Sequence, residues 1–330
     1  MLKVSIIIPV YGVEQYIEKC ARSIFEQSYS NLEILFVNDC TPDNSIQVVQ
    51  RLLEKYPARK DQVQILTQDK NRGVSAARKV GMKTITGDYC IQLDSDDYIA
   101  PTMIEELVLT AEREDADVVM CDYYLVSNNN ETHVHTNPDL NPIECVKLFL
   151  RGKLHAALWN KLVRVRLYTD HNIQFTEGLN MREDLSVMYR LLYFAERVAY
   201  ISKPFYYYVV RSGSVSSGIM NEKQQRNAQA LIEQMNQFFI IEKIHDQDLL
   251  DALLHFKAQI KSTILLYGNT DELNEDLYKD VKLRHYYSHP KIIPLLKAIG
   301  ILSCIGCTPF VRGYRLAFHR LSNLKRKFLK

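Results

Sequence analysis

Three carboxylates stand within four residues at Asp94-Ser95-Asp96-Asp97, directly after the apolar run 89–93. Like charges this close cannot all stay ionised unless a cation or hydrogen-bond donors lie among them. A Mg²⁺ or Mn²⁺ ion, held by one or two carboxylates and by substrate phosphates, is the natural neutraliser. The motif therefore predicts a divalent-metal site. The alternative is a solvated turn that caps the next helix.

Three other loops, 8–14, 37–43 and 71–78, hold residues that suit a nucleotide: an aromatic ring, carboxylates and arginines. Carboxylates can accept hydrogen bonds from a base or a ribose, and an arginine can pair with a phosphate. Each residue is weak evidence alone, since Asp39 can be a simple turn former and Arg78 a surface base. Four such loops at successive strand ends predict a nucleotide site.

The elements that must position these loops alternate between strand and helix. Strands are expected at 4–8, 33–37, 63–66, 89–93 and 117–121, and helices at 17–25, from about 45 to 56, at 74–85 and at 101–114. The run 4–8 is β-branched throughout, as expected for a strand that is buried on both faces. This order predicts an α/β fold with a mostly parallel, Rossmann-like sheet flanked by helices. Ligands of such sheets bind at the carboxyl ends of the strands.

The pattern changes after about residue 122. The polar, Asn-rich segment 127–141 is expected to be a loop, 143–210 to mix short helices with an aromatic strand at 204–210, and 222–267 to be helical. A linker is expected at 212–221, which is rich in Ser and Gly and could close over a bound nucleotide. We therefore expect a catalytic domain at 1–215, a helical domain at 216–290 and a tail at 291–330.

The tail differs from the body in charge. Residues 291–330 contain five Lys, four Arg and no Asp or Glu, whereas the other 290 residues carry 32 bases and 39 acids. Apolar residues with interspersed bases suit a helix that lies on an anionic membrane surface. The alternative is a basic helix packed on its own domain. A nucleic-acid partner would leave the carboxylates of 94–97 unexplained, so we expect none.

The four motifs, taken as a set, resemble those of the inverting family 2 nucleotide-sugar glycosyltransferases, which have the GT-A-type fold. The matching segments are 4–11, 37–39, Asn71-x-Gly73-x-Ser75-x-Ala77-Arg78 and 87–97, with weaker matches at 158–162, 182–185 and 206–214. One departure is visible: Cys40-Thr41-Pro42 replaces the family's usual Gly-Ser-Thr after Asp39. The loss of that glycine leaves the geometry of this turn open.

The resemblance implies a role for each matching residue. The donor nucleotide would contact Pro9, Val10, Tyr11, Glu14, Asp39, Asn71, Gly73, Arg78, Asp94 and Ser95, with Arg211 at the diphosphate. Asp96 together with Asp94 would bind Mn²⁺ or Mg²⁺. Asp184, preceded by Glu183, would be the general base, although an acidic pair also suits a helix N-terminus. On the acceptor side we expect Trp159, His155 and Lys161, with Trp159 either stacked on a sugar or part of the core.

The expected reaction is the transfer of one sugar, with inversion, from a nucleoside diphosphate sugar to a hydroxyl group. By family habit the donor would be a UDP-sugar, and the acceptor a glycan or lipid-linked glycan of a bacterial surface polysaccharide. The sequence contains no run of about 18 uncharged apolar residues that could span a bilayer, and residues 1–9 are too short for a signal peptide. We therefore expect a cytoplasmic protein, associated peripherally with the inner face of the membrane.

Three alternatives predict other features. A processive polysaccharide synthase would have spanning helices and a Gln-x-x-Arg-Trp-type motif, and 224–226 does not complete that motif. A nucleotide-dependent oxidoreductase would have Gly-x-Gly-x-x-Gly after the first strand, where only Gly12 is found. A non-catalytic relative would bind the nucleotide sugar without transfer, and the intact Asp94, Asp96 and Asp184 argue against it.

Overall fold

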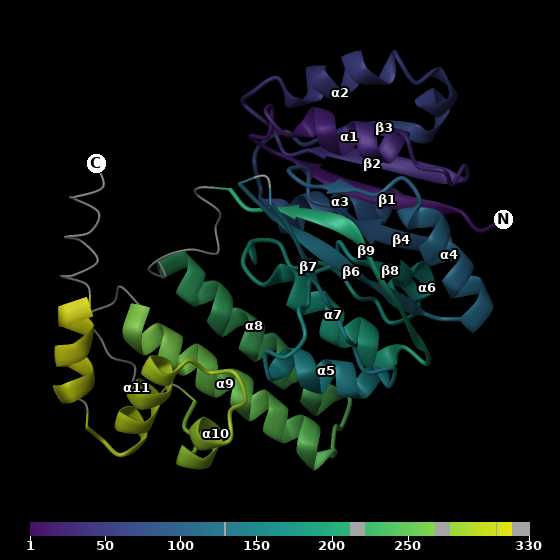
Figure 1. Ribbon diagram of the computed structural model, residues 1–330. Helices are drawn as coiled ribbons and strands as arrows, with labels where there is room; N and C mark the ends of the chain where they lie inside the picture. The colour runs from purple at the N-terminus through teal and green to yellow at the C-terminus, as the bar shows by residue number, and fades with distance from the viewer. Residues whose placement is uncertain (129, 212–221, 268–277, 308, 319–330) are drawn as a thin grey trace. The chain divides into compact units, whose positions relative to one another are not determined.

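The computed structural model describes residues 1–128, 130–211, 222–267, 278–307 and 309–318. The chain divides into two compact units (Figure 1). The first comprises Met1–Cys145 and Leu154–Ser214, and the second comprises Val146–Lys153 and Val215–Lys330. The expected linker at 212–221 and the end of the expected tail, 319–330, lie outside the described residues.

One sheet of nine strands forms the frame of the first unit in the described chain (Figure 1). Its order is β3-β2-β1-β4-β8-β6-β9-β5, and β7 pairs with β6. The strands are β1 (Val4–Val10), β2 (Leu32–Asn38), β3 (Val63–Thr67), β4 (Tyr89–Gln92), β5 (Tyr98–Ile99), β6 (Val118–Ser127), β7 (Asn130–Val134), β8 (Lys161–Arg164) and β9 (Val198–Val209).

The sheet combines parallel and antiparallel pairs, and β6 and β9 pair parallel in its second half. β3, β2, β1 and β4 run in one direction, so their carboxyl ends meet at one edge. β8 pairs antiparallel with both β4 and β6, and β7 and β5 also pair antiparallel with their neighbours. The sheet as a whole is therefore mixed: the expected run of neighbouring parallel strands is found in β3, β2, β1 and β4, whereas the rest of the sheet contains both kinds of pair.

Helices cover both faces of this sheet, as the α/β pattern predicts. In the first unit they are α1 (Ile17–Phe25), α2 (Ser45–Leu53), α3 (Val74–Thr84), α4 (Met103–Glu114), α6 (Val165–Asp170) and α7 (Glu183–Phe194). A 3-10 helix spans Pro57–Gln62. The helix α5 (Pro142–Leu150) contains the boundary between the two units. The apolar stripe that predicts a helix over 17–25 is buried in α1, through Ile17, Cys20, Ala21, Ile24 and Phe25.

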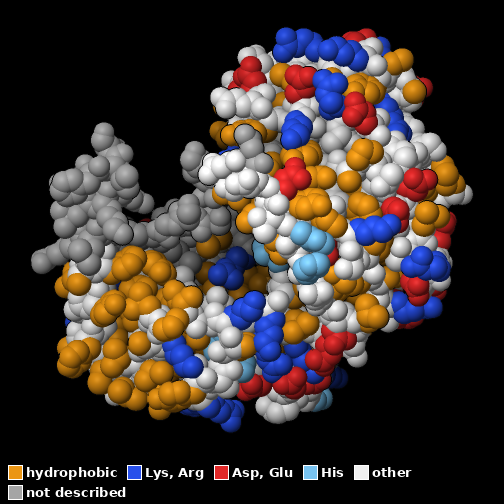
Figure 2. Space-filling model, viewed as in Figure 1, with side chains coloured by type: hydrophobic (Ala, Val, Ile, Leu, Met, Phe, Trp, Pro, Cys, Tyr) orange, Lys and Arg blue, Asp and Glu red, His pale blue; other side chains and the backbone are white. Residues whose placement is uncertain are grey.

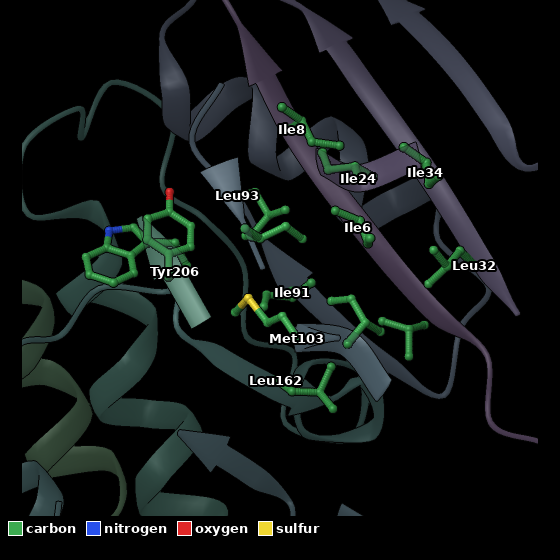
Figure 3. Packing of buried hydrophobic residues seen from close by; sticks show 14 of the residues in the cluster. Ile6, Ile8, Ile24, Leu32, Ile34, Ile91, Leu93, Met103, Leu162 and Tyr206 are labelled. Carbon is green, nitrogen blue, oxygen red and sulfur yellow. The ribbon is translucent and has the colours of Figure 1, made fainter. Parts of the chain in front are cut away.

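Alternate residues of β1 serve two cores. Ile6 and Ile8 pack with Ile24 of α1, as Figure 3 shows, and this core extends to Met103 of α4. Ile7 points to the other face, where it packs with residues of β2 and α3. Both faces of β1 are thus buried, which is the physical reason for its unbroken run of apolar side chains.

Two expected elements differ from those observed. The segment 127–141 is not wholly a loop, because β7 pairs antiparallel with the second half of β6 over Tyr123–Ser127. The helix expected over 222–267 is divided into α8 (Glu222–Ile241) and α9 (Gln247–Tyr267). Asp246 begins the second helix, where its Oδ1 accepts a hydrogen bond from the backbone N–H of Leu249 (2.9 Å).

The second unit contains α8, α9, α10 (Leu283–Tyr287), α11 (Pro294–Cys304) and a helical stretch at 309–318. Ile292, Leu296, Ile299 and Val311 share one core with residues of α9. A Cβ built on Gly300 would lie 2.0 Å from Cε1 of Tyr286, so only glycine fits where these two segments cross. The described part of the expected tail therefore packs within this unit, as the alternative reading predicts. No helix among the described residues is long and apolar enough to cross a membrane.

Candidate active site

The loops after β1 and β2 are tied together at the parallel edge of the sheet. Gly12 donates its backbone N–H to Oγ1 of Thr41 (2.9 Å), and Glu14 donates its N–H to Oδ2 of Asp43 (2.9 Å). The Glu14 carboxylate accepts hydrogen bonds from the backbone and side chain of Asn44 (both 3.1 Å). Glu14 therefore positions the second loop. Tyr11, beside this tie, leaves its ring 49% exposed at the edge.

Asp43 is held as a carboxylate by its surroundings. Burial alone would raise its pKa, but hydrogen bonds from Ser45, Thr41 and the N–H of Glu14 outweigh this effect and lower the pKa to about 2. An ionised Asp43 is thus part of the scaffold, because it accepts from both of the loops that border the expected nucleotide site.

Asp39 is buried and fully engaged at the end of β2. Its carboxylate accepts from Nε2 of Gln68 (2.8 Å) and from the backbone N–H groups of Arg72 (2.8 Å) and Gly73 (2.7 Å). Cys40 follows with φ of 56°, so a non-glycine residue adopts the left-handed conformation at the position where the family has glycine. The backbone of this turn therefore keeps a conformation that glycine favours. In this conformation the Asp39 carboxylate holds the loop 71–78 through its hydrogen bonds to Arg72 and Gly73.

The third loop in turn grips the segment before α7. Ser75 donates its hydroxyl to the carbonyl oxygen of Leu179, and its N–H lies 3.4 Å from Oδ1 of Asn180. Gly73 has φ of 89°, and a Cβ built on it would lie 2.3 Å from Nδ2 of Asn180. Glycine is therefore required at position 73 for close approach as well as for backbone conformation. Asn71, also expected at the nucleotide, is exposed on this loop.

Arg78 is the centre of the site. Its side chain is 1% exposed, and its Nη2 donates to Oδ1 of Asp94 (2.8 Å). Its Nη1 donates to Oε1 of Glu183 (3.0 Å) and to Oδ1 of Asp184. Burial alone would lower the pKa of Arg78, but the three carboxylates raise it above its usual value. One buried cation thus joins the expected metal-binding residue Asp94 to both candidate bases.

Asp94 and Asp96 face different cations. Burial raises the pKa of Asp94 to about 6, with Arg78 opposing the shift and the neighbouring acids Asp184 and Asp96 adding to it. Asp96 pairs instead with Arg211, whose side chain is 36% exposed and lies over the ring of Tyr16, 5.5 Å from its centroid. Arg211 is thus brought to the expected metal-binding residue, and its exposure allows it to exchange partners.

Asp97, the third acid of the motif, has a structural role. It is buried and accepts hydrogen bonds from the Tyr206 hydroxyl (2.6 Å) and from the N–H of Val209 (2.7 Å). Burial, followed by the charges of Asp94 and Asp96, raises its pKa to about 8. The two bonds fasten the carboxylate turn to β9. Ser95 lies buried within the same turn.

Glu183 and Asp184 occupy the first turn of α7. Burial raises the pKa of Glu183 to about 7, and the neighbouring charge of Asp184 adds to this shift. Arg182 precedes them in the left-handed conformation, with φ of 60°. Both carboxylates face Arg78, with side-chain exposures of 15% for Glu183 and 22% for Asp184. An acidic pair at a helix N-terminus is favourable on its own, but the shared guanidinium makes this pair part of the site.

The expected acceptor residues are placed differently from one another. The Trp159 ring is 3% exposed and stacks on Tyr206, with ring centroids 4.3 Å apart, so its burial favours the packing alternative. Lys161 is 1% exposed, and its Nζ donates to the carbonyl oxygens of His155 (3.1 Å) and Ala157 (2.6 Å) and to Oδ1 of Asn160 (2.7 Å). Burial lowers its pKa to about 8. Lys161 therefore holds the loop before β8.

His155 is the member of this group with exposed surface, although the surrounding protein still shields its ring in part from water. Residues 155–160 form no helix. The rings of His155 and Trp159 nevertheless lie 5.9 Å apart. Asp184 is close enough to oppose the lowering of the His155 pKa that burial and Lys161 cause. His155 thus lies beside the candidate base.

The donor set suits a hard divalent cation. Asp94 and Asp96 offer only carboxylate oxygens, which Mg²⁺ prefers and which also suit Mn²⁺. Among the described residues, Arg78 is the side chain that hydrogen-bonds to the Asp94 carboxylate, and it does so through Oδ1. The raised pKa of Asp94 is also the sign of a crowded anionic site, where an added cation would favour the ionised form. The residues present therefore fit the metal that the resemblance implies.

Comparison with known proteins identifies related sequences. The family model described as glycosyl transferase family 2 matches residues 5–170. The chain is 31% identical over 246 residues to the uncharacterized glycosyltransferase EpsJ of Bacillus subtilis (strain 168), covering 71% of this chain and 70% of EpsJ.

Solved structures share the fold. The crystal structure of S. aureus TarS 1–349 superimposes with a TM-score of 0.68 at 18% identity, covering 98% of this chain and 92% of that one. The same fragment in complex with UDP-GlcNAc gives a TM-score of 0.66 at 19% identity, with the same coverage. A mannosyltransferase from Pyrobaculum calidifontis, in complex with GDP-Man and Mn²⁺, gives 0.52 at 15% identity, covering 100% and 88%. The GT-A-type fold expected from the sequence is confirmed.

Proposed function

The chain belongs to glycosyl transferase family 2 and is a glycosyltransferase, and from that premise we propose that it moves one sugar with inversion. The donor is a nucleoside diphosphate sugar, and the acceptor is a hydroxyl group of a glycan or lipid-linked glycan in surface polysaccharide synthesis. The observation that carries this proposal is the buried Arg78, which bonds to Asp94 on the donor side and to Asp184 on the acceptor side.

The donor nucleotide binds at the parallel edge of the sheet. The exposed Tyr11 ring offers a stacking surface for the base at the end of β1. Pro9 and Val10 end the same strand, and Asp39 and Gly73 fix the backbone of the loops on either side. UDP is the favoured nucleotide, because TarS, which shares this fold, is found in complex with UDP-GlcNAc.

Asp94 and Asp96 would hold the divalent cation that accompanies the diphosphate. When bound, such a cation supplies positive charge to the leaving nucleoside diphosphate. Arg211 pairs with Asp96 and is partly exposed, so it can turn from this carboxylate to the diphosphate when the donor enters. Arg78 cannot exchange in this way because its side chain is buried among three acids.

Asp184 takes the proton from the acceptor hydroxyl. A hydroxyl group is a poor nucleophile at neutral pH, and a carboxylate within hydrogen-bond reach removes its proton as the new bond forms. Arg78 holds the Asp184 carboxylate in position through a hydrogen bond, and the exposed His155 offers the incoming acceptor a polar contact nearby. Attack from the base's side, opposite the leaving diphosphate, produces inversion, as it does in inverting hydrolases.

The second unit offers a surface for an anionic membrane. Its exposed apolar side chains include Ile293, Ile305, Phe310, Tyr314 and Leu316. Figure 2 shows apolar side chains gathered over the elements that are yellow in Figure 1, with basic ones among them. The segment 291–330 has no acidic residue. Apolar side chains that enter the headgroup region, together with bases that attract anionic lipid, give reversible binding. This arrangement would bring the enzyme to a lipid-linked acceptor.

The donor proposal is tested with a panel of nucleoside diphosphate sugars. Each is added to the protein with Mn²⁺ or with EDTA, and the melting temperature is measured, because a ligand of the native state must raise it. We expect one sugar nucleotide to stabilise the protein in a metal-dependent manner and to be consumed when acceptor is supplied. Stabilisation by none of the panel would refute the proposal.

The membrane proposal is tested by flotation with anionic vesicles of phosphatidylglycerol. Phe310→Ser combined with Leu316→Ser should abolish flotation, whereas Leu109→Ser, which changes another exposed leucine, in α4, should not. Neutral phosphatidylcholine vesicles should bind the wild-type protein weakly. Equal flotation of all variants on both vesicles would contradict the proposed surface.

A further inference from the structure

A second cluster of titratable side chains lies in the first unit, apart from the residues at the strand ends. Asp122 of β6 is completely buried, and its Oδ2 lies 2.8 Å from Nε2 of His133 and 3.0 Å from Nδ1 of His135. The two imidazole rings are 4.0 Å apart between centroids. The reaction proposed above uses none of these residues.

The local fold explains why the three side chains converge. His133 lies in β7 and His135 just beyond its end, and residues two apart in an extended chain point to the same face. Across the hairpin, Tyr124 pairs with His133, and Asp122, two residues before Tyr124, lies on the same face as that tyrosine. The pairing of β6 with β9 is irregular on both sides of Asp122. Such irregularities re-aim side chains and are common near functional sites.

The three ligand atoms lie close enough to one another to share one metal ion after small movements of the side chains. All three atoms lie within 4.8 Å of one another. In a tetrahedral zinc site with metal–ligand distances of about 2.0–2.1 Å, neighbouring ligand atoms are about 3.3 Å apart. The observed distances of 2.8 and 3.0 Å from the carboxylate oxygen to the two nitrogens need to open by only a few tenths of an ångström. Small rotations of the partly exposed imidazoles supply that change.

The carboxylate is also oriented from behind, as metal ligands usually are. Its second oxygen, Oδ1, accepts hydrogen bonds from the Tyr200 hydroxyl (2.6 Å) and from the N–H of Thr136 (2.7 Å). These bonds leave Oδ2 facing the histidines. His133 and His135 have side-chain exposures of 32% and 55%, so an ion and a water molecule can reach the open side of the cluster.

We propose that Asp122, His133 and His135 bind a divalent transition-metal ion, Zn²⁺ by the chemistry of the ligands, with water in the fourth position. Two imidazoles and one carboxylate favour zinc over the hard cations that suit Asp94 and Asp96. The ion would tie β7 and the chain that follows it to β6. The site is independent of the proposed transfer reaction, because it contains neither the donor loops nor the candidate base.

The test uses the full chain without a histidine tag, after treatment with EDTA and removal of the chelator. Co²⁺ is the probe, because its visible absorption reports tetrahedral coordination, and Zn²⁺ is then added in competition. We expect one equivalent of Co²⁺ to give an intense band that Zn²⁺ abolishes. His133→Ala and His135→Ala should each weaken binding by about tenfold or more.

Two matched variants make the result specific. His245→Ala removes an exposed histidine elsewhere, and Asp96→Asn removes a carboxylate of the active site. Both should keep the wild-type Co²⁺ band and affinity. Circular dichroism confirms that each variant is folded, and Tyr200→Phe, which leaves all three ligands in place, should weaken binding less than loss of a histidine. The absence of a Co²⁺ band, or a band unchanged in both histidine variants, would overturn the proposal and leave a hydrogen-bonded His–Asp–His group.

Discussion

Two groups of acids in the first unit are neutralised in different ways. At the ends of the parallel strands, Asp94, Glu183 and Asp184 share the buried guanidinium of Arg78. On β6, Asp122 has no arginine or lysine partner among the described residues, and it accepts instead from a tyrosine, a backbone N–H and two histidines.

The kind of cation beside each group of acids determines whether a metal ion can replace it. Arg78 keeps its charge at any ordinary pH, so it fixes three carboxylates in place while substrate comes and goes. A histidine can give up its proton and become a metal ligand, which an arginine cannot do. The strand-end site is therefore organised by a permanent protein cation, and the partly exposed Arg211 on Asp96 is a protein cation that can exchange partners.

The largest effect is expected from Asp184→Asn. The amide cannot accept the acceptor's proton, so turnover should fall by about 10²–10⁴-fold, while binding of the donor nucleotide should change little. Single-turnover kinetics with the donor selected by the panel measures this effect. Glu183→Gln, which changes the neighbouring acid, is the matched control and should lose less. If Glu183→Gln lost more than Asp184→Asn, the base would be Glu183.

The next largest effect is expected on stability, from the removal of the buried Arg78 guanidinium. Arg78→Met leaves three carboxylates without their shared partner, and loss of one partner of a buried ion pair costs about 3–5 kcal/mol. Urea unfolding should show this loss in the free energy of unfolding. Arg211→Met removes a partly exposed cation and should cost less than about 1 kcal/mol. Equal losses in the two variants would contradict the distinction between the fixed and the exchangeable cation.

Substitution of two tyrosines compares how strongly Asp97 and Asp122 depend on their hydrogen bonds. Tyr206→Phe removes one of the two bonds to the buried Asp97, and Tyr200→Phe removes one of four to Asp122. An underbonded buried carboxylate costs about 1–3 kcal/mol. We expect the larger loss in Tyr206→Phe, measured by thermal unfolding without added metal. A larger loss in Tyr200→Phe would mean that the histidines contribute little to holding Asp122.

The smallest effect concerns Asp43, whose lowered pKa has the opposite sign to those of Asp94 and Asp97. Its folded-state pKa of about 2 lies below the unfolded value, so the ionised group stabilises the fold above the unfolded pKa, and that contribution is lost as the pH falls through about 2. Asp43→Asn should cost about 1 kcal/mol at neutral pH. The difference from wild type should narrow as the pH falls below about 4. A constant difference from neutral to acidic pH would contradict this account.

The sequence predicted the parallel strands β1 to β4 well, because their signals are local. Buried strands are continuous apolar runs, and the carboxylates of 94–97 follow one of them directly. The expected strands at 4–8, 33–37, 63–66 and 89–93 are all confirmed. Parallel pairing then brings the loop residues together without any further information.

The long-range parts could not be predicted in this way. Arg78 meets Asp184 across 106 positions in the chain, and no local pattern reveals whether an arginine is buried. Burial likewise removed Lys161 and Trp159 from the exposed surface, where their types alone had suggested ligand contact. His133 and His135 lie in a polar segment whose strand forms only by pairing with β6. Two histidines separated by a single residue were a local signal for a metal site. The sequence held no corresponding signal for the position of Asp122.

The most direct test of the central claim measures UDP binding by calorimetry with Mn²⁺ or with EDTA, in the wild-type protein and in Asp96→Asn. If Asp94 and Asp96 hold the cation that carries the diphosphate, EDTA should weaken UDP binding to the wild type by about tenfold or more, or about 1.4 kcal/mol. Asp96→Asn should bind UDP weakly in both conditions. Wild-type affinity that is the same with Mn²⁺ and with EDTA would contradict the claim.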